Sequence, residues 1–114
     1  MKIVIVISQF NKKISNALLN GAKECYEKNN FSNNNLLVYE VPGAFEIPSM
    51  VKQILECTDD LDAIVTLGSI IKGETAHFEY ISSSVTDSIS QLSVESDIPI
   101  IYGVLTTYDY EQAI

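Results

Sequence analysis

The chain has 114 residues, 46% of them hydrophobic, and is therefore long enough to bury a core without disulfides or metals. Fifteen acidic residues against seven lysines give a net charge of −8, and the lysines form no run beyond Lys12-Lys13. This charge argues against binding to nucleic acids or anionic membranes. We expect a single domain over residues 1–114.

The two cysteines, Cys25 and Cys57, lie in helical patterns and lack metal-ligand spacing. We expect packed thiols in a reducing compartment, and no metal site. No apolar stretch approaches the roughly 20 residues that span a bilayer, and the first residues enter a strand pattern instead of a leader. These features predict a soluble, cytoplasmic protein.

Aliphatic runs of strand length alternate with helical patterns along the whole chain. The runs cover residues 3–7, 36–41, 61–67 and 98–105. Between them, three helix faces are predicted: Ile14, Leu18, Gly21, Ala22 and Cys25; Ile47, Val51, Ile54 and Leu55; Phe78, Ile81, Val85, Ile89 and Leu92. Such alternation predicts right-handed crossovers and a parallel sheet covered on both faces.

Boundary signals support this order. Pro48 suits the first turn of the second helix, the asparagine-rich stretch 29–35 should end the first helix, and Asp97-Ile-Pro99 should restart the chain as a strand. Residues 109–112 resemble the start of a fourth helix, yet only Ala113 and Ile114 follow.

The carboxyl ends of parallel strands open on one edge of the sheet, so the loops that follow them should converge there. Phe10 follows the first strand, either as a stacking platform for a planar ligand or as a loop residue folded back on the core. The second strand leads into Pro42-Gly-Ala-Phe-Glu46, whose small residues would expose backbone N–H groups to a polyol. Glu46 could bind that polyol or simply favour the start of a helix.

The loop after the third strand, predicted over residues 68–77, carries the richest chemistry. Gly73 allows close backbone approach, Thr75 supplies a hydroxyl, and the next helix should begin near residues 75–78, where its N-terminus favours an anion. His77, the sole histidine, would lie one turn from a bound phosphate and is the side chain best suited to moving protons at neutral pH. A structural or surface histidine is the alternative. Lys72 could neutralise the anion or remain a solvated lysine.

Four segments together resemble the 6,7-dimethyl-8-ribityllumazine synthase family. They are Ser8-Gln-Phe-Asn11, Val41-Pro-Gly-Ala-Phe-Glu-Ile-Pro48, Gly68-Ser-Ile-Ile-Lys-Gly-Glu-Thr-Ala-His-Phe-Glu-Tyr80 and Pro99-Ile-Ile-Tyr-Gly-Val-Leu-Thr-Thr107, the last followed by Glu111-Gln-Ala113. They run in order through nearly the whole chain, which makes the similarity far more specific than any short motif. A receiver domain would need acidic residues after the first strand, and a flavodoxin would need a phosphate loop there; Ser8-Gln9-Phe10 fits neither.

The resemblance implies a flavodoxin-like three-layer α/β/α sandwich with a four-stranded parallel sheet. It also implies a transferase of riboflavin biosynthesis that needs no cofactor and no metal. The reaction condenses 5-amino-6-(D-ribitylamino)uracil with 3,4-dihydroxy-2-butanone 4-phosphate to 6,7-dimethyl-8-ribityllumazine, with loss of phosphate and water.

The resemblance also assigns roles to individual residues. Phe10 would stack on the pyrimidine, and His77 would shuttle protons as the catalytic residue. The other substrate-binding positions fall into three groups: Gly43, Ala44, Phe45 and Glu46 at the ribityl chain and ring edge; Ser69, Ile70 and Ile71 beside the substrates; and Gly73, Glu74 and Thr75 at the phosphate.

The family further implies pentamers, in some members closed into 60-subunit shells, with each active site shared between neighbours. Tyr102 matches an aromatic residue that a neighbour contributes, commonly a phenylalanine. Two segments of the family pattern have no match in this sequence. One is a basic segment and final helix after Gln112-Ala113, which supplies an arginine and a lysine to the phosphate site; the other is a strand before Lys2. We therefore expect a domain without the final helix. It is either the enzyme or a weakly active or inactive relative that binds a ribityl-flavin-like ligand or serves as an assembly subunit.

Overall fold

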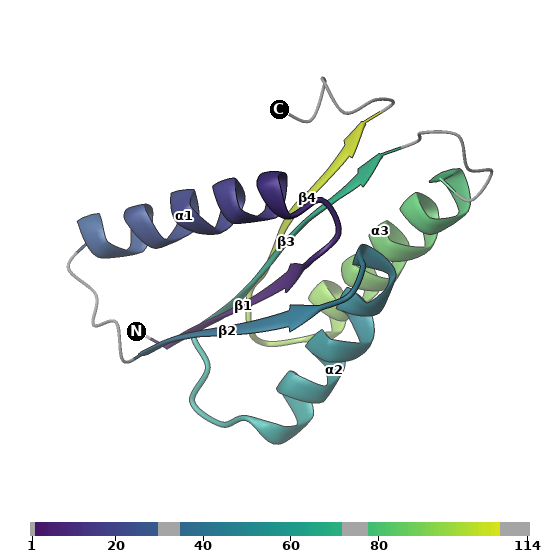
Figure 1. Ribbon diagram of the computed structural model, residues 1–114. Helices are drawn as coiled ribbons and strands as arrows, with labels where there is room; N and C mark the ends of the chain where they lie inside the picture. Colours follow the sequence, from purple (N-terminus) through teal and green to yellow (C-terminus); the bar gives the residue numbers. More distant parts are fainter. Residues whose placement is uncertain (1, 30–34, 72–77, 108–114) are drawn as a thin grey trace.

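The computed structural model describes residues 2–29, 35–71 and 78–107, with side chains described except at 71, 78–81 and 105–107 (Figure 1). Strands and helices alternate along the chain as predicted. Their bounds are β1 Ile3–Ser8, α1 Lys12–Lys28, β2 Leu36–Val41, a 3₁₀ turn Ala44–Glu46, α2 Ile47–Cys57, β3 Ala63–Ile71, α3 Phe78–Glu95 and β4 Ile100–Thr107.

The four strands form one sheet in the order β2-β1-β3-β4, and every pair is parallel. The chain moves from β1 to β2 on one side and then crosses to β3 and β4 on the other. The described residues therefore have the strand order of a flavodoxin-like sheet, and its direction of winding changes between β1 and β3.

The prediction that the third strand ends at Leu67 is wrong, because β3 continues to Ile71. Gly68 to Ile71 pair with residues 104–107 of β4, so a parallel partner is available for this aliphatic segment and keeps it extended. Thr106 and Thr107, beyond the end of the run predicted over residues 98–105, belong to β4 for the same reason.

The two faces of the sheet are covered by different helices (Figure 1): α1 lies on one face, and α2 and α3 lie on the other. The larger core lies under α2 and α3, where Ile47, Val51, Val85 and Ile89 pack against strand residues such as Ile64. On the face under α1, the buried strand residues Ile5, Ile7 and Leu67 pack against Leu18, Leu19 and Ala22. The predicted inward faces of α2 and α3 are confirmed at the described side chains.

The predicted packing of both cysteines is wrong, since Cys25 and Cys57 are free and exposed. The buried stripe of α1 runs from Ile14 to Tyr26 along a spacing of four residues, which leaves Cys25 at the edge of that stripe. Cys57 is the last residue of α2, beyond the part of that helix that packs on the sheet. Within the described ranges, no helix is both long enough and apolar enough to cross a membrane.

Candidate functional site

The carboxyl ends of β1 and β3 flank the point where the sheet changes its direction of winding. Open α/β sheets bind ligands in the crevice outside this point, because the connections leave it in opposite directions. We call residues 8–11 the β1 tip and residues 42–46 the β2 tip. Both lie at this edge of the sheet and carry residues that the sequence singled out.

The β1 tip presents an aromatic side chain to solvent. Phe10 is 55% exposed, so its ring does not fold back on the core and the stacking alternative remains. Asn11 follows with φ 57° and ψ 70°, a left-handed conformation that turns the chain directly into α1. Asparagine tolerates this region better than most residues, which explains how a sharp turn forms without glycine.

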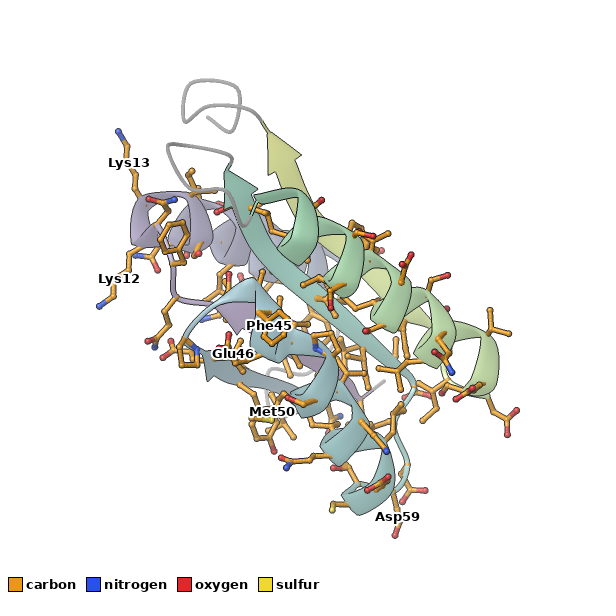
Figure 2. All side chains as sticks on the ribbon, turned by 90° about the vertical axis from the view of Figure 1, so that its right-hand side faces the viewer. Lys12, Lys13, Phe45, Glu46, Met50 and Asp59 are labelled. Carbon is orange, nitrogen blue, oxygen red and sulfur yellow. The ribbon has the colours of Figure 1, made fainter. Side chains whose placement is uncertain are left out.

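The β2 tip also exposes an aromatic ring, and hydrogen bonds between its own residues close the turn. Phe45 is 54% exposed, whereas the neighbouring Ala44 is buried and can meet a ligand only through its backbone. The Gly43 N–H donates to Glu46 Oε2 at 3.1 Å, and the Glu46 N–H donates to the Gly43 carbonyl at 3.1 Å. Figure 2 shows Phe45 and Glu46 next to one another where the chain enters α2, and Lys12 and Lys13 at the start of α1.

Two hydrogen bonds join the β1 tip to the end of β2, directly before the β2 tip. The Gln9 N–H donates to the Val41 carbonyl at 2.8 Å, and the Gln9 side-chain amide donates to a Glu40 carboxylate oxygen. The tips are therefore neighbours in space, although about thirty residues of sequence separate Gln9 from Glu40. The sequence prediction that these two loops converge is confirmed.

The side chains near the end of β3 are buried. Ser69 and Ile70 are 2% and 5% exposed, so each can reach a ligand at the rim through backbone groups alone. Ile71 is the last residue of β3. Gly73, Glu74, Thr75 and His77, together with Lys72, lie outside the described residues, and their predicted roles stay predictions.

Gly68 makes the close approach of β1 and β3 possible. A Cβ atom at this glycine would come within 2.5 Å of Ser8 Oγ and 3.5 Å of Ile47 Cδ1. The Ser8 side chain fills that space, and Ser8 is 1% exposed. Among the described residues, neither Ser8 Oγ nor Ser69 Oγ has a hydrogen-bond partner.

Tyr102 lies away from the tips of its own chain. It lies on the edge strand β4, where it pairs with Thr66 of β3, and its hydroxyl forms a hydrogen bond of 3.0 Å with the Thr86 hydroxyl of α3. The hydroxyl that the family's usual phenylalanine lacks therefore has a partner. The ring is 41% exposed, which leaves a surface free for contact with another molecule.

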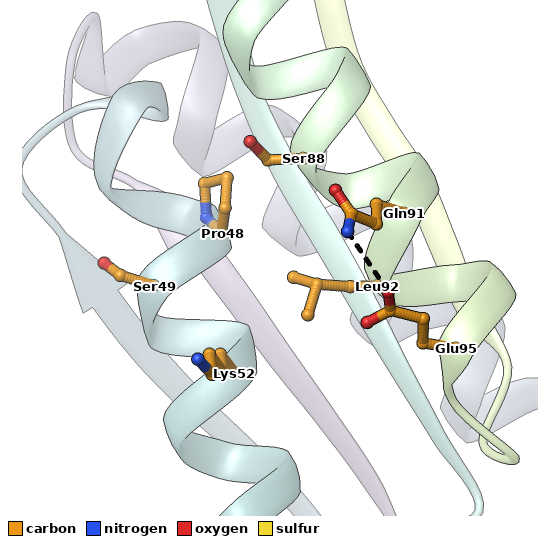
Figure 3. Close-up of a pocket in the computed structure, with 7 residues that line it drawn as sticks. All are labelled: Pro48, Ser49, Lys52, Ser88, Gln91, Leu92 and Glu95. Atoms are coloured by element: carbon orange, nitrogen blue, oxygen red, sulfur yellow. Dashed lines mark hydrogen bonds between the residues drawn. The ribbon is translucent and has the colours of Figure 1, made fainter.

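A groove of about 300 Å³ lies between α2 and α3 (Figure 3). Its lining consists of Pro48, Ser49, Lys52, Ser88, Gln91, Leu92 and Glu95, and Gln91 donates to Glu95 at 3.1 Å on the same helix. None of the predicted site residues lines this groove, so it is not the candidate site. Across the described part of the chain, no cluster of three or more His, Cys, Asp or Glu side chains could hold a metal ion.

Sequence reasoning missed the groups that hold the β1 tip in place. Ser15, in the first turn of α1, donates through its hydroxyl to the Ser8 carbonyl at 2.7 Å and approaches the Phe10 carbonyl at 3.2 Å. The Gln9–Glu40 contact was missed as well. A hydroxyl on the otherwise apolar inward face of a helix was the available signal for Ser15, because a buried hydroxyl normally finds an acceptor.

The strand order and the converging tips define an α/β protein of the flavodoxin-like, doubly wound class, with its candidate ligand site outside the carboxyl ends of the central strands. A de novo designed Rossmann fold protein matches this fold with a TM-score of 0.51 at 16% identity, covering 99% of this chain and 90% of the design.

The sequence comparisons identify the family. The 6,7-dimethyl-8-ribityllumazine synthase family model matches residues 1–114. The chain is 45% identical over 113 residues to the 6,7-dimethyl-8-ribityllumazine synthase of Chlorobium phaeovibrioides, covering 99% of this chain and 72% of that protein. Identity to the enzyme of the same name from Bacteroides fragilis is 44% over 113 residues, covering 99% and 78%. For the Clostridium kluyveri enzyme it is 43% over 114 residues, covering 100% and 73%. The chain belongs to the 6,7-dimethyl-8-ribityllumazine synthase family.

Proposed function

We propose that this chain is a transferase of riboflavin biosynthesis. It condenses 5-amino-6-(D-ribitylamino)uracil with 3,4-dihydroxy-2-butanone 4-phosphate to 6,7-dimethyl-8-ribityllumazine, within a single domain over residues 1–114. The observation that carries this proposal is the identity of 43–45% with lumazine synthases over 99–100% of this chain. The two aromatic tips at the edge of the sheet agree with it.

Phe10 of the β1 tip and residues 43–46 of the β2 tip would bind the pyrimidine substrate. The exposed ring of Phe10 offers a face on which a flat heterocycle can stack. Backbone groups at Gly43 and Ala44, the ring of Phe45 and the carboxylate of Glu46 would hold the ribityl chain and the ring edge. Carboxylate oxygens accept hydrogen bonds and a polyol offers several hydroxyl donors, so this division suits the chemistry of the substrate.

The segment that follows β3 would bind the phosphate and move protons. Backbone groups at Ser69, Ile70 and Ile71 would border the substrates, and Gly73, Glu74 and Thr75 would contact the phosphate. His77 would transfer protons while the amine and ketone form an imine and while phosphate leaves. Holding two substrates in a reactive arrangement supplies much of the rate, so one acid–base group could suffice.

Activity measurements test this proposal directly. Lumazine formation from the two substrates is followed by absorbance for the parent chain and for the variant His77→Ala. We expect turnover in the parent chain and a rate about 10- to 1000-fold lower in the variant, with little change in pyrimidine affinity, because a general acid/base is lost. Ser83→Ala, at an exposed position of α3, is the control and should behave as the parent.

An unchanged rate in His77→Ala would remove this residue from the mechanism. Ligand binding without turnover in the parent would favour a binding or assembly subunit.

We further propose that the chain assembles as a homopentamer, either free or within a 60-subunit shell, and that Tyr102 completes the site of a neighbouring subunit. Its position on the edge strand β4, away from the tips of its own chain, supports a role at a neighbour's site. Native mass spectrometry should give a mass of five subunits or a multiple of five. A monomer at micromolar concentration would contradict the proposal.

We propose a cytoplasmic location. Both cysteines are free and exposed, an arrangement that suits a reducing compartment. Fractionation of cells that produce the chain should recover it with cytoplasmic markers. Recovery with an oxidising compartment would contradict this location.

A further inference from the structure

One buried hydroxyl holds the backbone of the β1 tip. Ser15 is 3% exposed, and its Oγ lies 2.7 Å from the Ser8 carbonyl oxygen and 3.2 Å from the Phe10 carbonyl oxygen. A serine hydroxyl has a single hydrogen, so the Ser8 carbonyl accepts the principal hydrogen bond and the Phe10 carbonyl the longer branch. The hydroxyl thus bridges the last residue of β1 and the exposed aromatic residue.

The strand on the other side holds the residue between them. The Gln9 N–H donates to the Val41 carbonyl at 2.8 Å, and the Gln9 side chain donates to Glu40. The Ser8–Gln9 peptide group is therefore anchored at both ends, its carbonyl by α1 and its N–H by β2, and the Phe10–Asn11 peptide group is held at its carbonyl by α1. Phe10 emerges from this anchored backbone with its ring 55% exposed.

We propose that Ser15 is a positioning residue. Its hydroxyl fixes the backbone at Phe10, so that the Phe10 ring forms a rigid platform for a flat heterocycle. The part that concerns the heterocycle rests on the proposed function, which assigns the ring to the pyrimidine. A platform that is held before binding loses less conformational freedom when the ligand arrives, so affinity is higher than for a mobile ring.

The effect of Ser15→Ala follows from this role. The variant leaves the Ser8 and Phe10 carbonyls without the hydroxyl, and the tip gains freedom. We expect KM for the pyrimidine to rise about five- to tenfold while kcat at saturation stays within about twofold, because Ser15 contacts no reacting atom. Ser15→Thr keeps the hydroxyl and should restore KM. Ser15→Cys, a weaker donor of similar size, should lie between the two.

Ser8→Ala is the matched control. Ser8 and Ser15 are both serines and both nearly fully buried, and their side chains lie next to the same tip, but Ser8 Oγ has no partner among the described residues. Removing an unpaired buried hydroxyl should leave stability unchanged or raise it. Pyrimidine KM in Ser8→Ala should remain within about twofold of the parent value.

Two measurements decide the matter. Amide hydrogen exchange of the free chain reports on the tip itself, and we expect faster exchange at residues 9–12 in Ser15→Ala than in the parent, Ser15→Thr or Ser8→Ala. Titration with 6,7-dimethyl-8-ribityllumazine, followed by fluorescence, should show the same order of affinities.

The proposal fails if Ser15→Ala exchanges no faster at the tip, or if Ser8→Ala loses as much affinity as Ser15→Ala. A parent chain that neither turns over nor binds the lumazine contradicts the proposed function instead. In that case the exchange data alone decide whether Ser15 holds Phe10, so the two failures are distinguishable.

Discussion

The β1 tip and the β2 tip expose aromatic rings to nearly the same extent, 55% for Phe10 and 54% for Phe45, but the two are held in different ways. The β1 tip is held by Ser15 of α1 and also by residues distant in sequence, since Gln9 bonds to residues of β2. The β2 tip is closed by hydrogen bonds between Gly43 and Glu46, three residues apart. One platform is therefore set by tertiary contacts and the other by local ones. Substitutions far from the ligand should disturb only the first.

The largest expected effect comes from Gly68→Ala, which acts on the β1 tip through the neighbouring strand. The new Cβ would come within 2.5 Å of Ser8 Oγ in a closely packed region. We expect the free energy of unfolding to fall by about 2 kcal/mol, as in other overpacked cores. Urea denaturation measures the loss, and hydrogen exchange should show it at the β1 tip more than at the β2 tip.

A compensating substitution makes this prediction sharper. Ser8→Gly removes the atoms that the new Cβ would meet, leaving Ile47 Cδ1 at the ordinary contact distance of 3.5 Å. The double variant Ser8→Gly/Gly68→Ala should regain about half of the lost stability, the remainder reflecting the cost of glycine in a strand. A double variant no more stable than Gly68→Ala would show that the contact with Ser8 is not the cause.

The next effect concerns ligand binding. Phe10→Ala should weaken lumazine binding about tenfold, or about 1.4 kcal/mol, because the stacking face is lost. Phe45→Ala should weaken it less, about threefold, since the proposed function places that ring at the flexible ribityl chain. Both rings are more than half exposed, so neither variant should change the free energy of unfolding by more than about 0.5 kcal/mol. Isothermal titration calorimetry measures the affinities. A larger loss in Phe45→Ala would reverse the assigned roles.

The local closure of the β2 tip can be broken with Glu46→Ala. This variant removes the acceptor of the Gly43 N–H at the entrance to α2, and we expect a loss of about 1 kcal/mol in unfolding free energy, as for other helix-start contacts. Glu46→Gln keeps an acceptor oxygen and should lose less than half as much. Thermal and urea denaturation compare the three chains. Equal losses in the two variants would point to charge instead of the hydrogen bond.

The smallest change is expected at the turn of the β1 tip. Asn11 adopts φ 57°, a region open to glycine, so Asn11→Gly should leave the unfolding free energy within about 0.5 kcal/mol of the parent value. Lys13→Gly, two residues further on in the first turn of α1, is the control and should cost up to about 1 kcal/mol through lower helix propensity. A greater loss in Asn11→Gly would mean that the asparagine side chain, and not the backbone conformation, supports the tip.

Much of the fold was predictable from the sequence because the signals are local. Period-two and period-3.6 patterns located the strands and helices, and Pro48 lies in the first turn of α2 as predicted. The end of β3 was not predictable in this way. Gly68 suggested a loop, but pairing with β4 extends the strand to Ile71, and that pairing depends on a segment more than thirty residues away.

The candidate site shows the same division. The positions of Phe10 and Glu46 at one edge of the sheet were predictable from the sequence, since the loops that follow parallel strands share one edge. Whether Phe10 faced the core or solvent was open, and the tertiary structure exposes it. The sequence does not show what the Tyr102 hydroxyl contacts, and the packing of α3 against β4 supplies Thr86 as its partner.

By itself, then, the sequence determined the order of strands and helices, the parallel sheet and the family, because each is encoded in short periodic segments and long ordered motifs. Tertiary structure alone decided which hydroxyls find acceptors and which residues lie outside the core. Ser15 found the carbonyls of the β1 tip, Ser8 found no partner among the described residues, and Cys25 lay beside the buried stripe of its helix. Hydrogen-bond partners and burial depend on where distant segments cross, and no local pattern carries that information.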